Sequence, residues 1–192
     1  VFLVDGSSFV FRAYFQSINQ DARYNYRSDG LPTGAVRLFA NKLYQFIREG
    51  AVGVMPTHLG IIFDKAEKTF RNEIYADYKG TRSEVPDDLR PQFSLMREAV
   101  KAFGLEPIEQ QGFEADDLIA TYATQAGAAG ADVLIISADK DMMQIVSPHI
   151  NFYDFESGTR GRPGYRPERR IDVAGVVEYF GVPPEKVIDL QS

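Results

Sequence analysis

The sequence contains no cysteine among its 192 residues. Disulfide bonds and zinc sites built on thiolates are therefore excluded. No apolar run is long enough to cross a membrane. No signal peptide is visible either, because the sequence opens directly on the strand-like run Val1–Val4. We therefore expect a cytoplasmic protein without a membrane partner.

Positive charge is also in short supply, with 21 basic against 27 acidic residues and a formal net charge of −6. At first this argues against a nucleic-acid partner. The objection is weak, because seven of the acids are candidate metal ligands and bound cations would change the local field. The content of 44% hydrophobic and 25% charged residues is ordinary for one globular domain.

Apolar runs and amphipathic stretches alternate along the chain. Runs rich in β-branched residues predict strands at 1–4, 59–63, 133–137 and 150–153. Apolar residues at helical spacing predict helices at 35–48, 88–103, 114–126 and 172–180. Asp88 is the expected cap of the second helix, and Pro91 would lie in its first turn. The alternation predicts an α/β fold, with a central, mainly parallel sheet covered by helices on both faces.

Seven carboxylates fall in four short patches where a predicted strand ends or a helix begins. They are Asp5, Asp64, the group Glu114, Asp116 and Asp117, and the pair Asp139 and Asp141. The carboxyl ends of parallel strands lie at one edge of a sheet, where these acids would repel one another unless cations neutralise them. Oxygen ligands select hard divalent ions such as Mg²⁺ or Mn²⁺. Two such ions suit displacement at phosphorus, which predicts a phosphodiesterase.

Other interpretations exist for single patches. The sequence Glu114–Asp117 is also common helix-capping chemistry, and an acid after a strand is common in turns. The segment 139–141 would also suit an aspartyl phosphotransferase, although nothing marks one acid as the nucleophile. His58 and His149 lie near no acid patch, so structural or surface roles are expected for both. All four patches together favour one convergent site.

Two polar segments interrupt the α/β pattern. The segment 65–87 combines cations with aromatic residues, and three of its cations, Arg71, Lys79 and Arg82, are candidates for phosphate contacts. Unpaired bases could stack on exposed aromatic rings, for which the candidates are Tyr14, Phe15, Tyr24, Tyr26 and Tyr78. The segment 157–170 holds five arginines among glycines and prolines, and it is predicted to be a mobile basic loop.

An ordered series of motifs resembles the 5′→3′ exonuclease domains of bacterial DNA polymerase I. This family is related to flap endonucleases and phage 5′ nucleases, with a PIN-like fold. The resemblance covers nearly the whole chain and is specific as a series. Its motifs are Leu3–Tyr14, Gly30–Val36, Phe63–Asp64, Phe70–Arg71, Tyr78–Arg82, Gly112–Asp117 and Ser137–Asp141.

The resemblance implies roles for individual residues. A first metal would be held by Asp5, Asp64, Glu114 and Asp116, and a second by Asp116, Asp139 and Asp141, with Asp117 close by. Arg71 and Lys79 would steer the scissile phosphate from the base of a helical arch, residues 72–100, through which a free 5′ strand passes. Further DNA contacts are expected from Arg12, Tyr14, Tyr78, Lys79 and Arg82, and the segment near Phe9, Arg12 and Tyr14 would shape the DNA junction.

The chain also departs from the family pattern. The family's second metal site uses a Gly-Asp-x-x-Asp-Asn motif followed by a helix–three-turn–helix that grips duplex DNA. We expect residues 1–192 to be a nuclease domain cut before this region, which would bind DNA weakly and cleave poorly alone. The segment 157–170 looks longer than the usual connection, and no role is implied for it.

The resemblance implies a monomeric, nucleoid-associated nuclease with two Mg²⁺ or Mn²⁺ ions in the complete protein. Its substrates would be 5′ flaps, nicked duplexes and RNA primer–DNA junctions in primer removal and repair. One rival is a PIN-like ribonuclease, for which the long segment 65–103 would be surplus. Another is a DNA-binding module with an incomplete catalytic site, against which the seven retained carboxylates speak.

Overall fold

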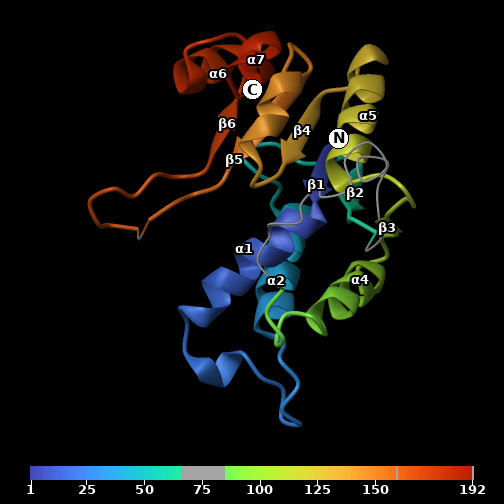
Figure 1. Ribbon diagram of the computed structural model, residues 1–192, viewed down its shortest axis with the longest axis vertical. Helices are drawn as coiled ribbons and strands as arrows, with labels where there is room; N and C mark the ends of the chain where they lie inside the picture. The colour runs from blue at the N-terminus through green and yellow to red at the C-terminus, as the bar shows by residue number, and fades with distance from the viewer. Residues whose placement is uncertain (66–84, 159, 192) are drawn as a thin grey trace.

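The protein is built on one six-stranded sheet with the strand order β3-β2-β1-β4-β5-β6 (Figure 1). The computed structural model describes residues 1–65, 85–158 and 160–191. Neighbouring strands are parallel except for β6, which runs antiparallel to β5. The strands are β1 Phe2–Asp5, β2 Leu59–Ile62, β3 Pro107–Ile108, β4 Val133–Ile136, β5 Ile150–Asp154 and β6 Arg169–Ile171. The predicted α/β class and mainly parallel sheet are confirmed.

Helices cover both faces of the sheet (Figure 1). One face carries α1 Gly6–Ile18, α2 Gly34–Arg48 and α4 Gln92–Ala102, and the other carries α5 Ala115–Ala128, α6 Val173–Phe180 and α7 Val187–Gln191. The strands divide their side chains between the two cores: Phe2 and Val4 of β1 enter the first, and Leu3 enters the second. Side chains alternate in this way because successive residues of a strand point to opposite faces.

Helix α1 was not predicted from the sequence. Its apolar residues lie on several sides, since Phe9, Val10 and Ala13 are buried while Phe11 and Phe15 are exposed. The helical period is therefore hard to see in the sequence. The helix begins where the Oδ1 atom of Asp5 accepts a hydrogen bond from the Ser8 backbone N–H at 2.9 Å. The last residue of β1 thus acts as the cap of the next element.

The other predicted helices are confirmed with small shifts, and one start was wrong. The helix predicted at 88–103 begins at Gln92, with Pro91 at the capping position and without a side-chain cap. The Oδ1 atom of Asp88 instead accepts a hydrogen bond from the Tyr14 hydroxyl at 2.8 Å, and its carbonyl accepts one from the Gln92 side chain. Short 3₁₀ turns complete the fold at Ala22–Tyr24, Lys140–Ile145 and Pro184–Lys186.

The segment 157–170 was predicted as a loop, and most of its described residues form turns and irregular structure, but its two ends pair as a β-hairpin. Ser157 and Arg166 exchange two backbone hydrogen bonds of 2.9 Å, and the returning strand becomes β6. We call residues 155–158 and 160–168 the hairpin arm. Figure 1 shows this arm running out from the β5–β6 edge of the sheet, away from the helices. The antiparallel return was missed because its run of arginines lacks an apolar alternation.

Part of the predicted arch, residues 72–100, lies outside the described residues, namely 72–84. Its described part includes much of α4, where Met96 and Val100 are fully buried in the first core. Residues 92–100 therefore pack against the body of the domain. Among the described residues, no helix has both the length and the apolar character needed to span a membrane.

Candidate active site

Four of the predicted acids line one cavity of about 750 Å³ at the carboxyl ends of the strands. They are Asp5 at the end of β1, Asp64 just past β2, Asp116 in the first turn of α5 and Asp139 past β4. The sheet order places β1 between β2 and β4, so acids far apart in the sequence lie beside one another. We call this the acidic cavity. The predicted gathering of the patches is confirmed for these four residues.

Asp5 lines the acidic cavity and is only 3% exposed. Its Oδ1 accepts from the Ser8 backbone N–H at 2.9 Å, and its Oδ2 accepts from the Ser137 hydroxyl at 2.7 Å. Burial raises the pKa of Asp5, the hydrogen bonds from Ser8 and Ser137 oppose this shift, and the charge of Asp64 adds to it. Each carboxylate oxygen keeps a further lone pair that can face a cation.

Asp64 is held at three points. Its Oδ1 accepts from the Ala115 backbone N–H at 2.7 Å, at the amino end of α5. Its own backbone N–H donates to the Ser7 hydroxyl at 2.7 Å, and its carbonyl accepts from the Arg97 guanidinium at 3.0 Å. Residues from α1, α4 and α5 therefore fix both the main chain and the carboxylate of Asp64.

The acidic start of α5 serves two purposes. Glu114 and Asp117 form a reciprocal capping box, in which the Asp117 Oδ2 accepts from the Glu114 backbone N–H at 3.0 Å. Asp116, between them, lines the acidic cavity. Burial, followed by the charges of Asp5, Asp139, Asp64 and Glu114, raises the pKa of Asp116 to about 7. The capping interpretation is thus confirmed for Glu114 and Asp117, and the metal-binding role of Asp116 stays a prediction.

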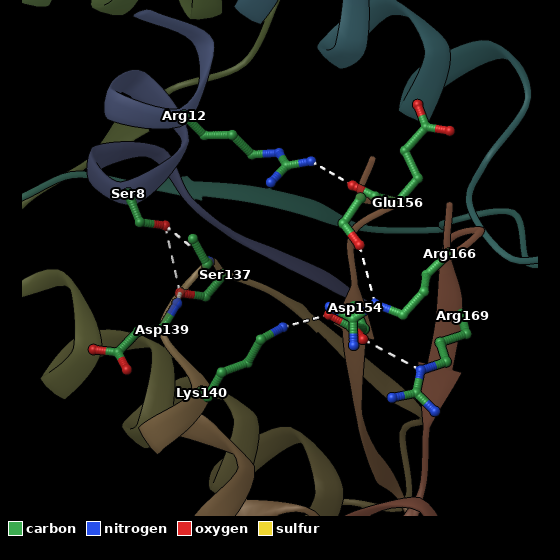
Figure 2. A network of polar contacts seen from close by, with 11 residues as sticks. Ser8, Arg12, Ser137, Asp139, Lys140, Asp154, Glu156, Arg166 and Arg169 are labelled. Atoms are coloured by element: carbon green, nitrogen blue, oxygen red, sulfur yellow. Dashed lines mark hydrogen bonds and ion pairs between the residues drawn. The ribbon is translucent and has the colours of Figure 1, made fainter. Parts of the chain in front are cut away.

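Asp139 and Asp141 take different positions. Asp139 lines the acidic cavity, and its Oδ1 accepts from the Asp141 backbone N–H at 2.9 Å. The Asp139 backbone N–H donates to the Ser137 hydroxyl at 3.0 Å, which links this loop to the group that holds Asp5 (Figure 2). Asp141 is exposed and is absent from the residues lining the cavity. Its predicted place in a second metal site stays a prediction.

The donor chemistry of the acidic cavity fits a hard divalent cation, because carboxylate oxygens of four segments face one space. Among the described residues, no Lys, Arg or His forms an ion pair with Asp5, Asp64, Asp116 or Asp139. Within that same part of the chain, no three Asp, Glu or His side chains stand close enough to hold one ion.

The residues predicted to contact DNA have mixed outcomes. Tyr14 is 9% exposed, and its hydroxyl is bound to Asp88, so stacking on a base was a wrong prediction for this buried ring. Phe15, Tyr24 and Tyr26 are more than half exposed and remain available for stacking. The candidates Arg71, Tyr78, Lys79 and Arg82 lie outside the described residues.

Arg12 lines the acidic cavity, but its guanidinium is already engaged (Figure 2). It donates to the Glu156 carbonyl at 2.8 Å and lies 4.3 Å from the centre of the Phe155 ring. Arg12 thus ties α1 to the base of the hairpin arm, and its predicted DNA contact stays a prediction. The histidines lie away from the acidic cavity, as expected: His58 contacts Thr57, and His149 pairs with Asp132 at 3.2 Å.

The sequence analysis missed the groups that hold the acids in place. Ser7, Ser8 and Ser137 each bond to a site residue or its neighbour, although their types alone carry no signal. Two of these serines directly follow the first strand and its acid, and the third stands two residues before Asp139. This nearness to the strand ends was the available clue. Arg97 lies 33 residues from Asp64 in sequence, and no local pattern marks it.

Solved structures share this fold. The chain matches the 5′-exonuclease of phage T5 with bound zinc at a TM-score of 0.68 and 18% identity, covering 100% of this chain and 65% of that one. It matches a T5 flap endonuclease complex with DNA and metal ions at a TM-score of 0.66 and 20% identity, covering 99% and 64%. The fold and the acidic cavity therefore define an α/β protein with the architecture of 5′ nucleases.

Residues 1–181 match the family described as "5'-3' exonuclease, N-terminal resolvase-like domain", and the chain belongs to this family. It is 51% identical over 195 residues to DNA polymerase I of Rhizobium leguminosarum, covering 100% of this chain and 18% of that protein. It is 35% identical to DNA polymerase I of Bacillus caldotenax, covering 99% and 20%. The chain thus spans about a fifth of the length of these curated relatives. The family match does not favour the PIN-like ribonuclease.

Proposed function

We propose that this domain hydrolyses phosphodiester bonds in DNA as a metal-dependent 5′→3′ exonuclease and flap endonuclease. The observation that carries the proposal is the acidic cavity, in which Asp5, Asp64, Asp116 and Asp139 meet. Among the described residues, no protein cation forms an ion pair with any of them. Burial and, after it, the charges of the neighbouring carboxylates raise the pKa of Asp116. The carboxylates of this cavity would repel a polyanionic substrate unless cations first occupied the cavity.

Divalent ions, Mg²⁺ or Mn²⁺, would be held by Asp5, Asp64 and Asp116 in one site and by Asp116 and Asp139 in another. When bound, two such ions supply an activated water and stabilise the leaving oxygen of an in-line displacement. The predicted ligands Glu114, Asp117 and Asp141 lie next to these acids in sequence, and we propose them as supporting groups. We therefore expect activity to depend most on Asp5, Asp64, Asp116 and Asp139.

The residues of the chain prepare the site for this chemistry. Ser8 and Ser137 hold both oxygens of Asp5, and Ala115 holds one oxygen of Asp64, so these carboxylates are oriented before substrate arrives. Phe11 and Phe15 line the same cavity and offer apolar surface beside it, to which bases near the scissile bond could pack. Arg71 and Lys79 are proposed to steer the scissile phosphate.

The proposed substrates are 5′ flaps, nicked duplexes and RNA primer–DNA junctions, processed in primer removal and repair. We propose that the domain acts as a monomer on chromosomal DNA in the cytoplasm, as the N-terminal part of a DNA polymerase I. The 51% identity to a polymerase of this kind over the whole of this chain supports the assignment. The helix–three-turn–helix implied by the family resemblance would add the duplex grip.

A flap-cleavage assay tests the proposal. A 5′-labelled nicked flap duplex is incubated with this chain, and with a version extended by about a hundred residues, in Mg²⁺, Mn²⁺ or EDTA. We expect cleavage at the junction only with metal, and stronger cleavage by the extended version. Loss of cleavage in Asp64→Ala, with DNA binding retained, would assign the activity to this cavity. Metal-independent cleavage, or none in either version, would contradict the proposal.

A further inference from the structure

Arg97 lies on α4 outside the acidic cavity, and it joins three elements next to it. Its guanidinium donates from Nη2 to the Asp64 carbonyl at 3.0 Å and from Nε to the Glu109 carboxylate at 2.9 Å. Its Nη1 donates to the Phe93 carbonyl at 3.1 Å, within its own helix. The same group lies 4.8 Å from the centre of the Phe63 ring. One planar cation therefore contacts the end of β2, the residue after β3 and the helix that covers them.

These contacts converge on the segment Phe63–Asp64. The ring of Phe63 is 1% exposed, so the guanidinium rests on a group that is itself fixed in the core. The carbonyl of the next residue, Asp64, accepts a hydrogen bond from one amino group of the guanidinium. Arginine is suited to this because its five donors have a fixed planar geometry, which a lysine ammonium cannot reproduce. The peptide that follows Asp64 is therefore oriented by Arg97.

Orientation of this peptide matters for the carboxylate of Asp64. The Asp64 backbone N–H is fixed by Ser7, and its Oδ1 is fixed by the Ala115 N–H. The contact from Arg97 fixes the remaining backbone group, the carbonyl. With all three points held, the second oxygen of the carboxylate has a defined direction. Without Arg97, the main chain at Asp64 could rotate about the other two contacts.

We infer that Arg97 is a positioning residue for the metal-binding carboxylate of Asp64. The inference rests on the proposed function, because it gives Asp64 the role of a metal ligand. Groups that orient metal ligands typically change metal affinity by about 10- to 100-fold when they are removed. We therefore expect Arg97→Met to weaken Mn²⁺ binding about tenfold and to lower kcat more than it raises KM.

The chain offers a matched control in Glu109. Glu109→Gln removes the charge of the ion pair with Arg97 but leaves the guanidinium free to keep its hydrogen bond to the Asp64 carbonyl. We expect this variant to bind Mn²⁺ within about twofold of the wild type, since this ion pair is partly exposed and such pairs contribute little. Arg97→Lys keeps the positive charge but lacks the fork, and it replaces Arg97→Met if the methionine variant does not fold.

The experiment is Mn²⁺ titration calorimetry on the whole chain for wild type, Arg97→Met, Glu109→Gln and Asp64→Asn, below the unfolding temperature of each. Weak binding by Arg97→Met together with near-normal binding by Glu109→Gln supports the inference. Near-normal binding by Arg97→Met, or an equal loss in Glu109→Gln, overturns it while the proposed function stands. Unchanged binding by Asp64→Asn would instead remove the metal-ligand role of Asp64, and the inference with it.

Discussion

Two acids near the carboxyl end of the sheet, Asp154 and Asp116, have opposite electrostatic surroundings. Asp154, at the end of β5, forms ion pairs with Lys140 and Arg169 (Figure 2). Burial alone would raise its pKa, but the two cations bring the pKa of Asp154 below its usual value. Burial also raises the pKa of Asp116 in the acidic cavity, and there the surrounding carboxylates add to the shift, which brings its pKa to about 7.

Asp154 is therefore an acid that stabilises the fold, whereas Asp116 is suited to bind a cation from outside the protein. The charge of Asp154 is already balanced by side chains of the protein, so it needs no further partner. The charge of Asp116 opposes folding of the domain, and it is retained at a cost in stability. Such a cost is typical of functional sites. A series of Asp→Asn variants compares the two groups directly, since this change removes charge and keeps shape.

The largest expected effect is on cleavage. Asp116→Asn should lower the rate of metal-dependent flap cleavage by at least about 100-fold, because even residues that only orient metal ligands are worth about 10- to 100-fold. Asp154→Asn should stay within about threefold of the wild type in the same assay. A comparable loss in both variants would show that the two groups do not differ in function.

The second effect is on the stability of the metal-free protein at different pH values. An acid with a raised pKa holds its proton more tightly in the folded than in the unfolded state, so Asp116 lowers folding stability as pH rises from about 4 to 7. Asp116→Asn should therefore gain stability over the wild type across this window, by no more than about 4 kcal/mol at pH 8. Urea unfolding in EDTA at pH 5 and pH 8 measures this, and an equal difference at both values would contradict it.

The third effect has the opposite sign. Asp154→Asn should lower the free energy of unfolding at pH 7 by about 1–2 kcal/mol, because it leaves Lys140 and Arg169 without their partner in a partly buried site. The lowered pKa of Asp154 means that its contribution is present above the unfolded pKa of about 4 and is lost as pH falls below it. Unfolding curves at pH 7 and pH 3 should show the difference shrink, and a constant difference would be evidence against the ion pairs.

The smallest effect provides a baseline. Asp132 is 88% exposed and pairs with His149, which is 53% exposed. Asp132→Asn should change the free energy of unfolding by less than about 0.5 kcal/mol, because exposed substitutions and surface pairs contribute little. It should leave cleavage unchanged. A larger change in either measurement would mean that Asp→Asn substitution alone affects this domain, and the other comparisons would need correction.

The sequence predicted the acidic cavity better than its surroundings. Each of β1, β2 and β4 is a short apolar run followed closely by an acid, and parallel pairing brings their ends together whatever the details. The burial of Tyr14 could not be predicted from the sequence, because it depends on how α1 packs against the segment around Asp88. The partners of Asp154 were equally hidden, since Arg169 arrives only through the return of the hairpin arm.

The most direct test of the account is the effect of Mn²⁺ on thermal unfolding at pH 8, for wild type and Asp116→Asn. A ligand that binds only the folded state raises the unfolding temperature, and the rise grows with the ratio of ligand concentration to Kd. We predict a clear rise for the wild type and a much smaller one for Asp116→Asn, with Asp154→Asn behaving like the wild type. An unfolding temperature that Mn²⁺ leaves unchanged in the wild type would contradict the claim that the acidic cavity is a divalent metal site.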